Sequence, residues 1–544
     1  MHRRSKATVV ATSIALLCAT PTAVAAGPAP CPPPPLSQPP VIAGIDLNHA
    51  TIPELQRAMN SGRLTSVQLT RFYLKRISAF NPVLHALIST TSDALGQAAA
   101  SDARRRHHAT LGPMDGIPIL VKDNIDTTDA PTTAGSLALA DAPPAQPAGV
   151  VDRLRAAGAV IMGKTNMSEW AGYRSLNGSA GWSAEGGQTH NPYVLDHSPC
   201  GSSSGSAVAV SANLATVAVA TETDGSVVCP SGTNGIVGIK PSLGIVSRGG
   251  IVPITREQDT AGPMARNVTD AAILLAAMDG PDPRDPVTDT PSAVDHALGD
   301  YTRFLKPGAL KGKRIGVWRD QFNIGENADT DAVFNRAVDE LRRLGATPVD
   351  VVIPYLDDVN NNEFPAIHYE FKHDLNAYLA ETPGNHPADL TGLIQFNLDH
   401  ASAEMPFFAQ EIWESADASD GDLNDPVHIQ MRTDATGAAR RGINETLAKY
   451  HLDAIVAPTN NAANVIPLGT GQGDNGFLLG TSTPAAVSGY TDMTVPMGFV
   501  GPLPVGLSIM AGQYSEPTVI SLAYAFEQST HARRSPTFLP TSTP

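Results

Sequence analysis

Residues 198–231 read SPCGSSSGSAVAVSANLATVAVATETDGSVVCPS, and this stretch decides how the rest of the chain is interpreted. A Gly/Ser loop leads into a helix of small residues, which is followed by a short apolar strand and a second turn at 223–226. Glycines allow backbone conformations in which several N–H groups point into one cavity. A tetrahedral oxyanion requires such donors, and a serine beside them becomes a nucleophile when a base removes its proton.

On both sides of this stretch, short apolar runs alternate with helical patterns. Strands are predicted at 117–121, 159–162, 314–317 and 349–353, with helices between them at 151–157 and about 329–344. Capping boxes at 51–54 and 65–68 predict two further helix starts. This alternation is typical of an α/β fold with a largely covered sheet. With no repeat or long linker after residue 45, a single large domain is the simplest prediction.

The composition divides the chain into a leader, a tether and a folded domain. Residues 1–26 combine a basic start, an apolar run and small residues at 23–25, which predicts a signal peptide and export to the periplasm or the medium. Residues 27–44 are a Pro-rich tether. The folded domain should occupy 45–540, and its mainly helical part at 355–450 is expected to shape the substrate site.

Charge and cysteine usage exclude several classes of protein. The formal net charge of −16 disfavours nucleic-acid and anionic-membrane partners, and the apolar run is too short for a permanent anchor, so no membrane partner is expected for the mature form. Removal of the leader takes Cys18 and leaves Cys31, Cys200 and Cys229. An odd number gives no disulfide framework, so free buried thiols are expected rather than a Cys200–Cys229 bridge, which stays the alternative. No His/Cys/Asp cluster has ligand spacing, so neither a metal nor another cofactor is expected.

The base that a serine nucleophile needs is not fixed by spacing alone. Lys122 ends the apolar strand at 117–121, where removal from water would lower its pKa and let it accept a proton. The alternative is a structural lysine paired with Asp123 or another acid, and Lys164 stands in a similar position. The Gly/Ser loop also has a plain alternative, phosphate binding, although neither common nucleotide-binding motif fits it.

Six segments together resemble the amidase signature family. They are GIP at 116–118 leading to KDN at 122–124, GKTNMSEW at 163–170, GSSSG at 201–205, DGS at 224–226, VPMG at 495–498 and LPVGL at 503–507. The segments follow the family's order and span about residues 50 to 530. The resemblance implies a mixed β-sheet covered by helices on both faces.

The resemblance also implies roles for individual residues. Ser226 would be the nucleophile, Ser202 would relay the proton from a cis peptide, and Lys122 would be the neutral base. The backbone N–H groups of Thr223, Asp224, Gly225 and Ser226 would form the oxyanion hole, and the reaction would release ammonia from a carboxamide.

The chain departs from the family pattern near these residues. Cys200, Ser204 and Asp224 stand where glycine is usual, and Val228 replaces a typical arginine. None of the four changes removes a reacting group, but all alter the polarity beside the nucleophile.

Within the family the segments are most similar to bacterial peptide amidases, which remove the C-terminal amide of peptides. The alternatives are an amidase for another small or aryl amide, and an exported binding protein without catalysis. A Ser-His-Asp hydrolase would instead need a histidine near Ser226. Export argues against a subunit that amidates charged tRNA, because such a subunit needs cytosolic partners.

Overall fold

The computed structural model describes residues 40–319, 327–474 and 479–542. The predicted signal peptide, and the tether up to residue 39, lie outside the described residues.

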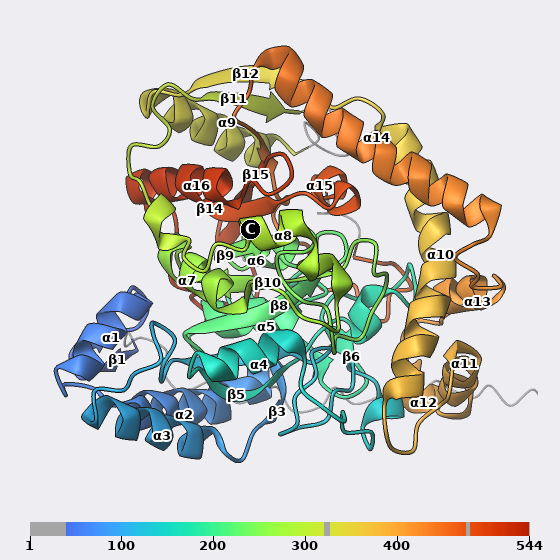
Figure 1. The fold of residues 1–544 in the computed structure, drawn as a ribbon, viewed down its shortest axis with the longest axis horizontal. Helices are drawn as coiled ribbons and strands as arrows, with labels where there is room; N and C mark the ends of the chain where they lie inside the picture. The colour runs from blue at the N-terminus through green and yellow to red at the C-terminus, as the bar shows by residue number, and fades with distance from the viewer. Residues whose placement is uncertain (1–39, 320–326, 475–478, 543–544) are drawn as a thin grey trace, which may run out of the picture.

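One large mixed sheet forms the centre of the molecule (Figure 1). Within the described residues it has eleven strands in the order β12-β11-β13-β15-β14-β9-β10-β8-β4-β5-β3. Their bounds are β3 Leu87–Thr90, β4 Pro118–Lys122, β5 Val160–Thr165, β8 Val217–Glu222, β9 Val237–Lys240, β10 Thr260–Ala265, β11 Arg314–Trp318, β12 Thr347–Val351, β13 Ala454–Pro458, β14 Asp492–Val500 and β15 Leu503–Met510. β4 runs parallel to both β5 and β8, whereas β10 is antiparallel to β8 and β14 is antiparallel to β15.

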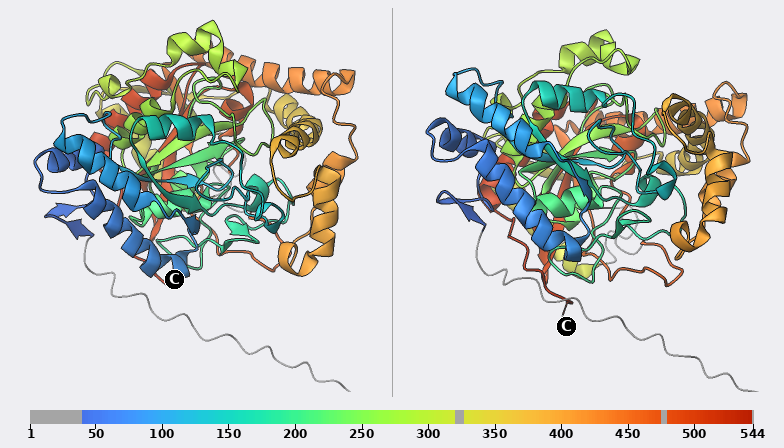
Figure 2. Two further views of the ribbon diagram at one scale, coloured as in Figure 1. Left: turned by 60° about the horizontal axis from the view of Figure 1, so that its bottom comes forward. Right: turned by 90° about the horizontal axis from the view of Figure 1, so that it is seen from below.

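Helices flank this sheet, so the predicted fold, a single α/β domain with a covered mixed sheet, is confirmed (Figures 1 and 2). The helices are α1 Ile52–Asn60, α2 Ser66–Leu84, α3 Ala94–Arg106, α4 Gly149–Ala156, α5 Ser204–Ser211, α6 Val228–Thr233, α7 Val268–Met278, α8 Pro291–His296, α9 Ala328–Arg343, α10 Leu356–Glu381, α11 Leu390–Asp399, α12 Ala401–Glu404, α13 Glu411–Asp417, α14 Pro426–Tyr450, α15 Thr483–Ser488 and α16 Glu516–Thr530. In the part of the chain that the structure describes, every helix is too short or too polar to span a bilayer.

Local sequence signals place most of these elements within a few residues. Both capping boxes form, at Thr51 and at Thr65, where the side chain and the residue three positions later satisfy each other's N–H groups. The strand predicted at 117–121 is β4, shifted by one residue. The strand predicted at 349–353 is β12, which begins and ends two residues earlier because its pairing register with β11 starts at Thr347. The positions of the elements therefore follow from sequence, whereas their exact ends follow from pairing.

The helices of residues 356–450 lie along one flank of the sheet (Figures 1 and 2). α10 and α14 pack against each other and are joined by a buried ion pair, because Arg432 on α14 donates two hydrogen bonds to the carboxylate of Glu370 on α10. His428 and Thr255 also contact this carboxylate. These contacts hold the pKa of Glu370 below its ordinary value, although burial acts in the opposite direction.

Removing the cation from this buried pair should destabilise the fold. We expect Arg432→Met to lower the free energy of unfolding by about 3–5 kcal/mol, because Glu370 would stay buried without its main partner. Urea denaturation at pH 7 measures this change. Arg342→Met is the matched control, since Arg342 and its partner Asp339 are 58% and 72% exposed and such pairs contribute at most about 1 kcal/mol. Equal effects of the two substitutions would show that the buried pair of Arg432 and Glu370 stabilises the fold no more than an exposed pair does.

Candidate active site

Lys122 is the last residue of β4 and is completely buried. Its Nζ lies 2.8 Å from Ser202 Oγ, 2.9 Å from Thr221 Oγ1 and 3.3 Å from the carbonyl oxygen of Thr221. Because β4 and β8 are parallel neighbours, their carboxyl ends meet at one edge of the sheet and bring Lys122 beside Thr221. Burial lowers the pKa of Lys122 to about 7, while the charges of Asp259 and Glu222 act in the raising direction.

Ser202 and Ser226 continue a chain of polar contacts from this lysine. Ser202 Oγ donates a hydrogen bond of 3.0 Å to Ser226 Oγ. Ser202 follows a cis peptide bond after Gly201, in the loop that leads into α5, and Ser226 ends the turn between β8 and α6. The structure therefore brings the three residues singled out in the sequence into one line, amine to hydroxyl to hydroxyl.

The turn at 223–226 contains the backbone N–H groups that the sequence predicts to form an oxyanion hole. None of the hydrogen bonds within the described residues uses the N–H groups of Thr223, Asp224, Gly225 or Ser226. Gly225 has φ +78°, a conformation that disfavours any residue with a side chain. Within the described residues these four N–H groups therefore have no hydrogen-bond acceptor, and the oxyanion hole expected here stays a prediction.

Two carboxylates hold this turn in place through hydrogen bonds. Glu222 Oε2 accepts hydrogen bonds from the N–H groups of Val227 and Val228, at 2.7 and 3.0 Å, which fixes the start of α6. Asp224 accepts from the hydroxyls of Ser482 and Thr483 next to α15. Asp224 thus uses its carboxylate to tie the turn to α15, a contact that glycine could not make.

Lys164, the rival base, has a different environment. Its Nζ donates to the carbonyl oxygen of Ile125 at 2.6 Å and to Thr132 Oγ1 at 2.8 Å, and lies 3.7 Å from Asp123 Oδ1. Asp123 therefore pairs with Lys164 and leaves Lys122 without an acidic partner in the described residues. Of the two lysines, the structure places only Lys122 in contact with a serine of the site.

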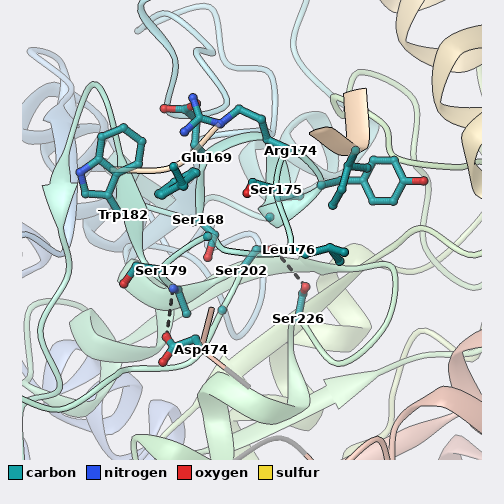
Figure 3. A pocket seen from close by; sticks show the side chains of 18 of the residues that line it. Ser168, Glu169, Arg174, Ser175, Leu176, Ser179, Trp182, Ser202, Ser226 and Asp474 are labelled. Carbon is teal, nitrogen blue, oxygen red and sulfur yellow. Dashed lines mark hydrogen bonds and ion pairs between the residues drawn. The ribbon is translucent and has the colours of Figure 1, made fainter. Parts of the chain in front are cut away.

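A cavity of about 280 Å³ opens onto the two serines (Figure 3). Its apolar lining comes from Tyr173, Leu176, Trp182, Phe364, Phe408 and Ile412. Arg174 and Glu169 also line the cavity; the guanidinium lies 2.8 Å from Glu169 Oε1 and 4.3 Å from the centre of the Phe408 ring. The cavity therefore combines an apolar surface with a buried ion pair.

Sequence reasoning missed the carboxylate of Asp474, which also lines the cavity. Its Oδ2 accepts hydrogen bonds from the N–H of Ala180 and from Ser198 Oγ, at 3.0 and 2.7 Å (Figure 3 shows the first). Burial raises the pKa of Asp474 to about 6. Asp474 links the cavity wall to the loop before Ser202, and no local sequence signal indicates such a contact.

The expectation of free thiols at Cys200 and Cys229 is wrong. The two sulfur atoms form a disulfide, with the Cα atoms 6.1 Å apart, which is within the usual range. The residues are 29 positions apart in sequence, and they meet only because the loop before Ser202 folds against α6. Cysteine number alone could not show this proximity.

Histidines and metal-binding groups do not contribute to the site as described. No histidine lines the cavity among the residues that the structure describes, and Ser226 Oγ hydrogen-bonds with Ser202 there. Across 40–319, 327–474 and 479–542, no three His, Cys, Asp or Glu side chains gather in a way that could hold a metal ion. A Ser-His-Asp arrangement at Ser226 is therefore absent from the described part of the chain.

Several known proteins resemble this chain in sequence and fold. The Amidase family model matches residues 68–520. A probable amidase of Arabidopsis thaliana is 40% identical over 504 residues, which cover 91% of this chain and 92% of the relative. The crystal structure of the peptide amidase from Stenotrophomonas maltophilia has 47% sequence identity and a TM-score of 0.85, covering 90% of this chain and 99% of that one. An amidase family protein from Bacillus anthracis is 33% identical with a TM-score of 0.81, covering 90% and 92%.

The chain belongs to the Amidase family, as the six sequence segments predicted. It is an amidase, a hydrolase of amide bonds, and its structure is close to that of peptide amidase.

Proposed function

We propose that this amidase hydrolyses the C-terminal amides of peptides through an acyl-enzyme on Ser226, with Ser202 as the proton relay and Lys122 as the base. The observation that carries this proposal is the continuous line of contacts from Lys122 Nζ through Ser202 Oγ to Ser226 Oγ, at 2.8 and 3.0 Å. These distances are short enough for a proton to pass along the line.

The first half of the reaction forms the acyl-enzyme. Ser226 Oγ attacks the amide carbonyl carbon while its proton passes to Ser202, whose own proton passes to neutral Lys122. The N–H groups at 223–226 stabilise the negative charge that develops on the carbonyl oxygen, and one such donor typically contributes about 2.7–4 kcal/mol. The proton then returns from Lys122 through Ser202 to the leaving nitrogen, and ammonia departs.

The second half of the reaction releases the acid. Water attacks the ester of Ser226, and its proton follows the same route to Lys122. The proton then returns through Ser202 to Ser226 Oγ as the carboxylic acid departs. Lys122 begins and ends the cycle neutral, which its burial favours.

The substrate class rests on the cavity and on the likeness to peptide amidase. Aromatic and aliphatic side chains line the cavity. Three of them, Phe364, Phe408 and Ile412, come from residues 355–450. We assign to this helical region the choice of acyl group, because its side chains line the cavity beside the loop at 172–182, with Phe408 packed on Trp182 and Phe364 on Tyr173. An aryl amide would also fit between these rings and is the second candidate.

We also propose that the protein is exported, with residues 1–26 as its signal peptide. The basic start, apolar run and small residues at 23–25 support this proposal. The Cys200–Cys229 disulfide is consistent with it, because disulfides persist in oxidising compartments.

Ammonia release from a panel of amides tests the proposed reaction. We expect a peptide amide with an apolar last residue to be preferred over benzamide and an unsubstituted aliphatic amide, and the corresponding peptide acid to give no ammonia. Ser226→Ala and Lys122→Ala should each lower kcat/KM by at least about 10³-fold, because each removes a reacting group.

Ser231→Ala is the matched control for the serine variant. Ser231, on α6, is buried like Ser226, and its hydroxyl has no hydrogen-bond partner among the described residues. Its loss should therefore change kcat/KM by less than about twofold. Preference for benzamide would favour the second candidate, whereas full activity of Ser226→Ala would disprove the acyl-enzyme.

The pH dependence tests the role of Lys122. Because the base must be neutral, kcat/KM should fall about tenfold per pH unit below the pKa of about 7 and reach a plateau above it. Initial rates between pH 5 and pH 9 measure this profile. A profile that is flat across pH 7 would show that Lys122 is not the base.

Export is tested on the full chain expressed in a bacterial host. We expect the protein outside the cytoplasm to begin at about residue 26 or 27, as found by N-terminal sequencing. Recovery of an intact N-terminus in the cytoplasmic fraction alone would contradict export.

A further inference from the structure

The two serines of the site lie on separate segments, and a disulfide joins these segments. Ser202 and Ser226 are 24 residues apart in sequence. Cys200 precedes Ser202 by two residues, and Cys229 follows Ser226 by three, within the first turn of α6. The bond between them therefore lies next to both hydroxyls that must stay aligned.

Hydrogen bonds also join these two segments, among them the 3.0 Å contact of Ser202 Oγ with Ser226 Oγ. The N–H of Ser203 donates to the carbonyl oxygen of Ser226 at 3.3 Å, a long hydrogen bond. Asn234 Nδ2, at the other end of α6, donates to the carbonyl oxygen of Pro199 at 2.8 Å. The disulfide is the one covalent link between the two segments within the described residues.

The backbone of Cys200 gives an independent reason to assign a function to this bond. Cys200 has φ +55°, in the left-handed region that favours glycine. A cysteine here is therefore conformationally unfavourable unless its side chain provides something that glycine cannot. The structure shows what the side chain provides, a covalent bond to the helix that follows the nucleophile.

We propose that the Cys200–Cys229 disulfide is a positioning device that keeps Ser202 in reach of both Lys122 and Ser226, so that the amidase is fully active only when this bond is formed. The inference rests on the proposed reaction of Ser226. Cys200 also lines the cavity together with Ser202 and Ser226, so the bond lies where the two hydroxyls meet the cavity. Displacements of about 1 Å in such alignments cost up to about 100-fold in rate.

Opening the bond is a two-electron reduction. Dithiothreitol transfers two electrons and two protons to the two sulfur atoms, which become thiols, and is itself oxidised to a cyclic disulfide. The two cysteines are 2% and 6% exposed, so a small reductant at high concentration is required.

Reduction of the wild-type enzyme is the first test. Peptide mapping by mass spectrometry should locate the bond between Cys200 and Cys229 in the oxidised protein and show two alkylated thiols after dithiothreitol. We expect kcat for a peptide amide to fall at least about tenfold with KM changed less than about twofold, and re-oxidation to restore kcat. Circular dichroism before and after reduction distinguishes a loss of alignment between the two serines from unfolding of the protein.

Two variants keep the inference testable if the reduced protein unfolds. Cys200→Gly suits the left-handed backbone, and Cys229→Ala leaves the backbone of α6 unchanged, so both should fold. Each should show the lowered kcat of the reduced enzyme and no further response to dithiothreitol. The pH at half-maximal activity should stay near 7, because Lys122 keeps its burial.

The outcomes separate the two proposals. Unchanged kcat in the reduced wild type with both thiols titrated, or in folded Cys200→Gly, would overturn the positioning role while leaving the proposed function intact. Absence of ammonia release from the oxidised wild type would instead contradict the proposed function on which the inference rests.

Discussion

Removal of one lysine amine from water is the constraint on which the site depends. Lys122 has no exposed surface and no ion pair in the described residues, and hydroxyl and carbonyl groups surround its Nζ. Such an amine favours the neutral form, with a pKa of about 7, and is therefore able to accept a proton near neutrality. The buried β4 residues that precede it, Ile119 to Val121, create this environment, so the core of the sheet also determines the chemistry of the site.

The sheet topology explains why Lys122, Ser202 and Ser226 meet at one end of the strands. Parallel pairing of β4 and β8 places Lys122 and the turn at 223–226 at the same end of the sheet. α5 begins beside this edge and brings Ser202 between them. Each group thus comes from a different element, and Glu222, Asp224 and the disulfide restrict how far those elements can move relative to one another.

The cavity combines the sheet edge with a part of the chain that lies far from it in sequence. Residues of the loop at 172–182 line it together with Phe364, Phe408 and Ile412 of the helical flank at 356–450. The ion pair of Arg432 with Glu370 stabilises that flank by joining α10 to α14. The aromatic lining of the cavity and the line from Lys122 through Ser202 to Ser226 therefore come from separate parts of the chain.

The sequence by itself determined the α/β alternation, both capping boxes, and the segments that carry Lys122, Ser202 and Ser226, because these depend on local patterns or on family motifs. Which lysine touches a serine, and the walls of the cavity, were decided only by the tertiary structure. The tertiary structure also decided the Cys200–Cys229 disulfide, for which the sequence led to the wrong expectation of free thiols. The physical reason is that burial, ion pairing and side-chain bonding depend on distances between residues far apart in the chain, as Asp123 shows by pairing with Lys164 and leaving Lys122 free.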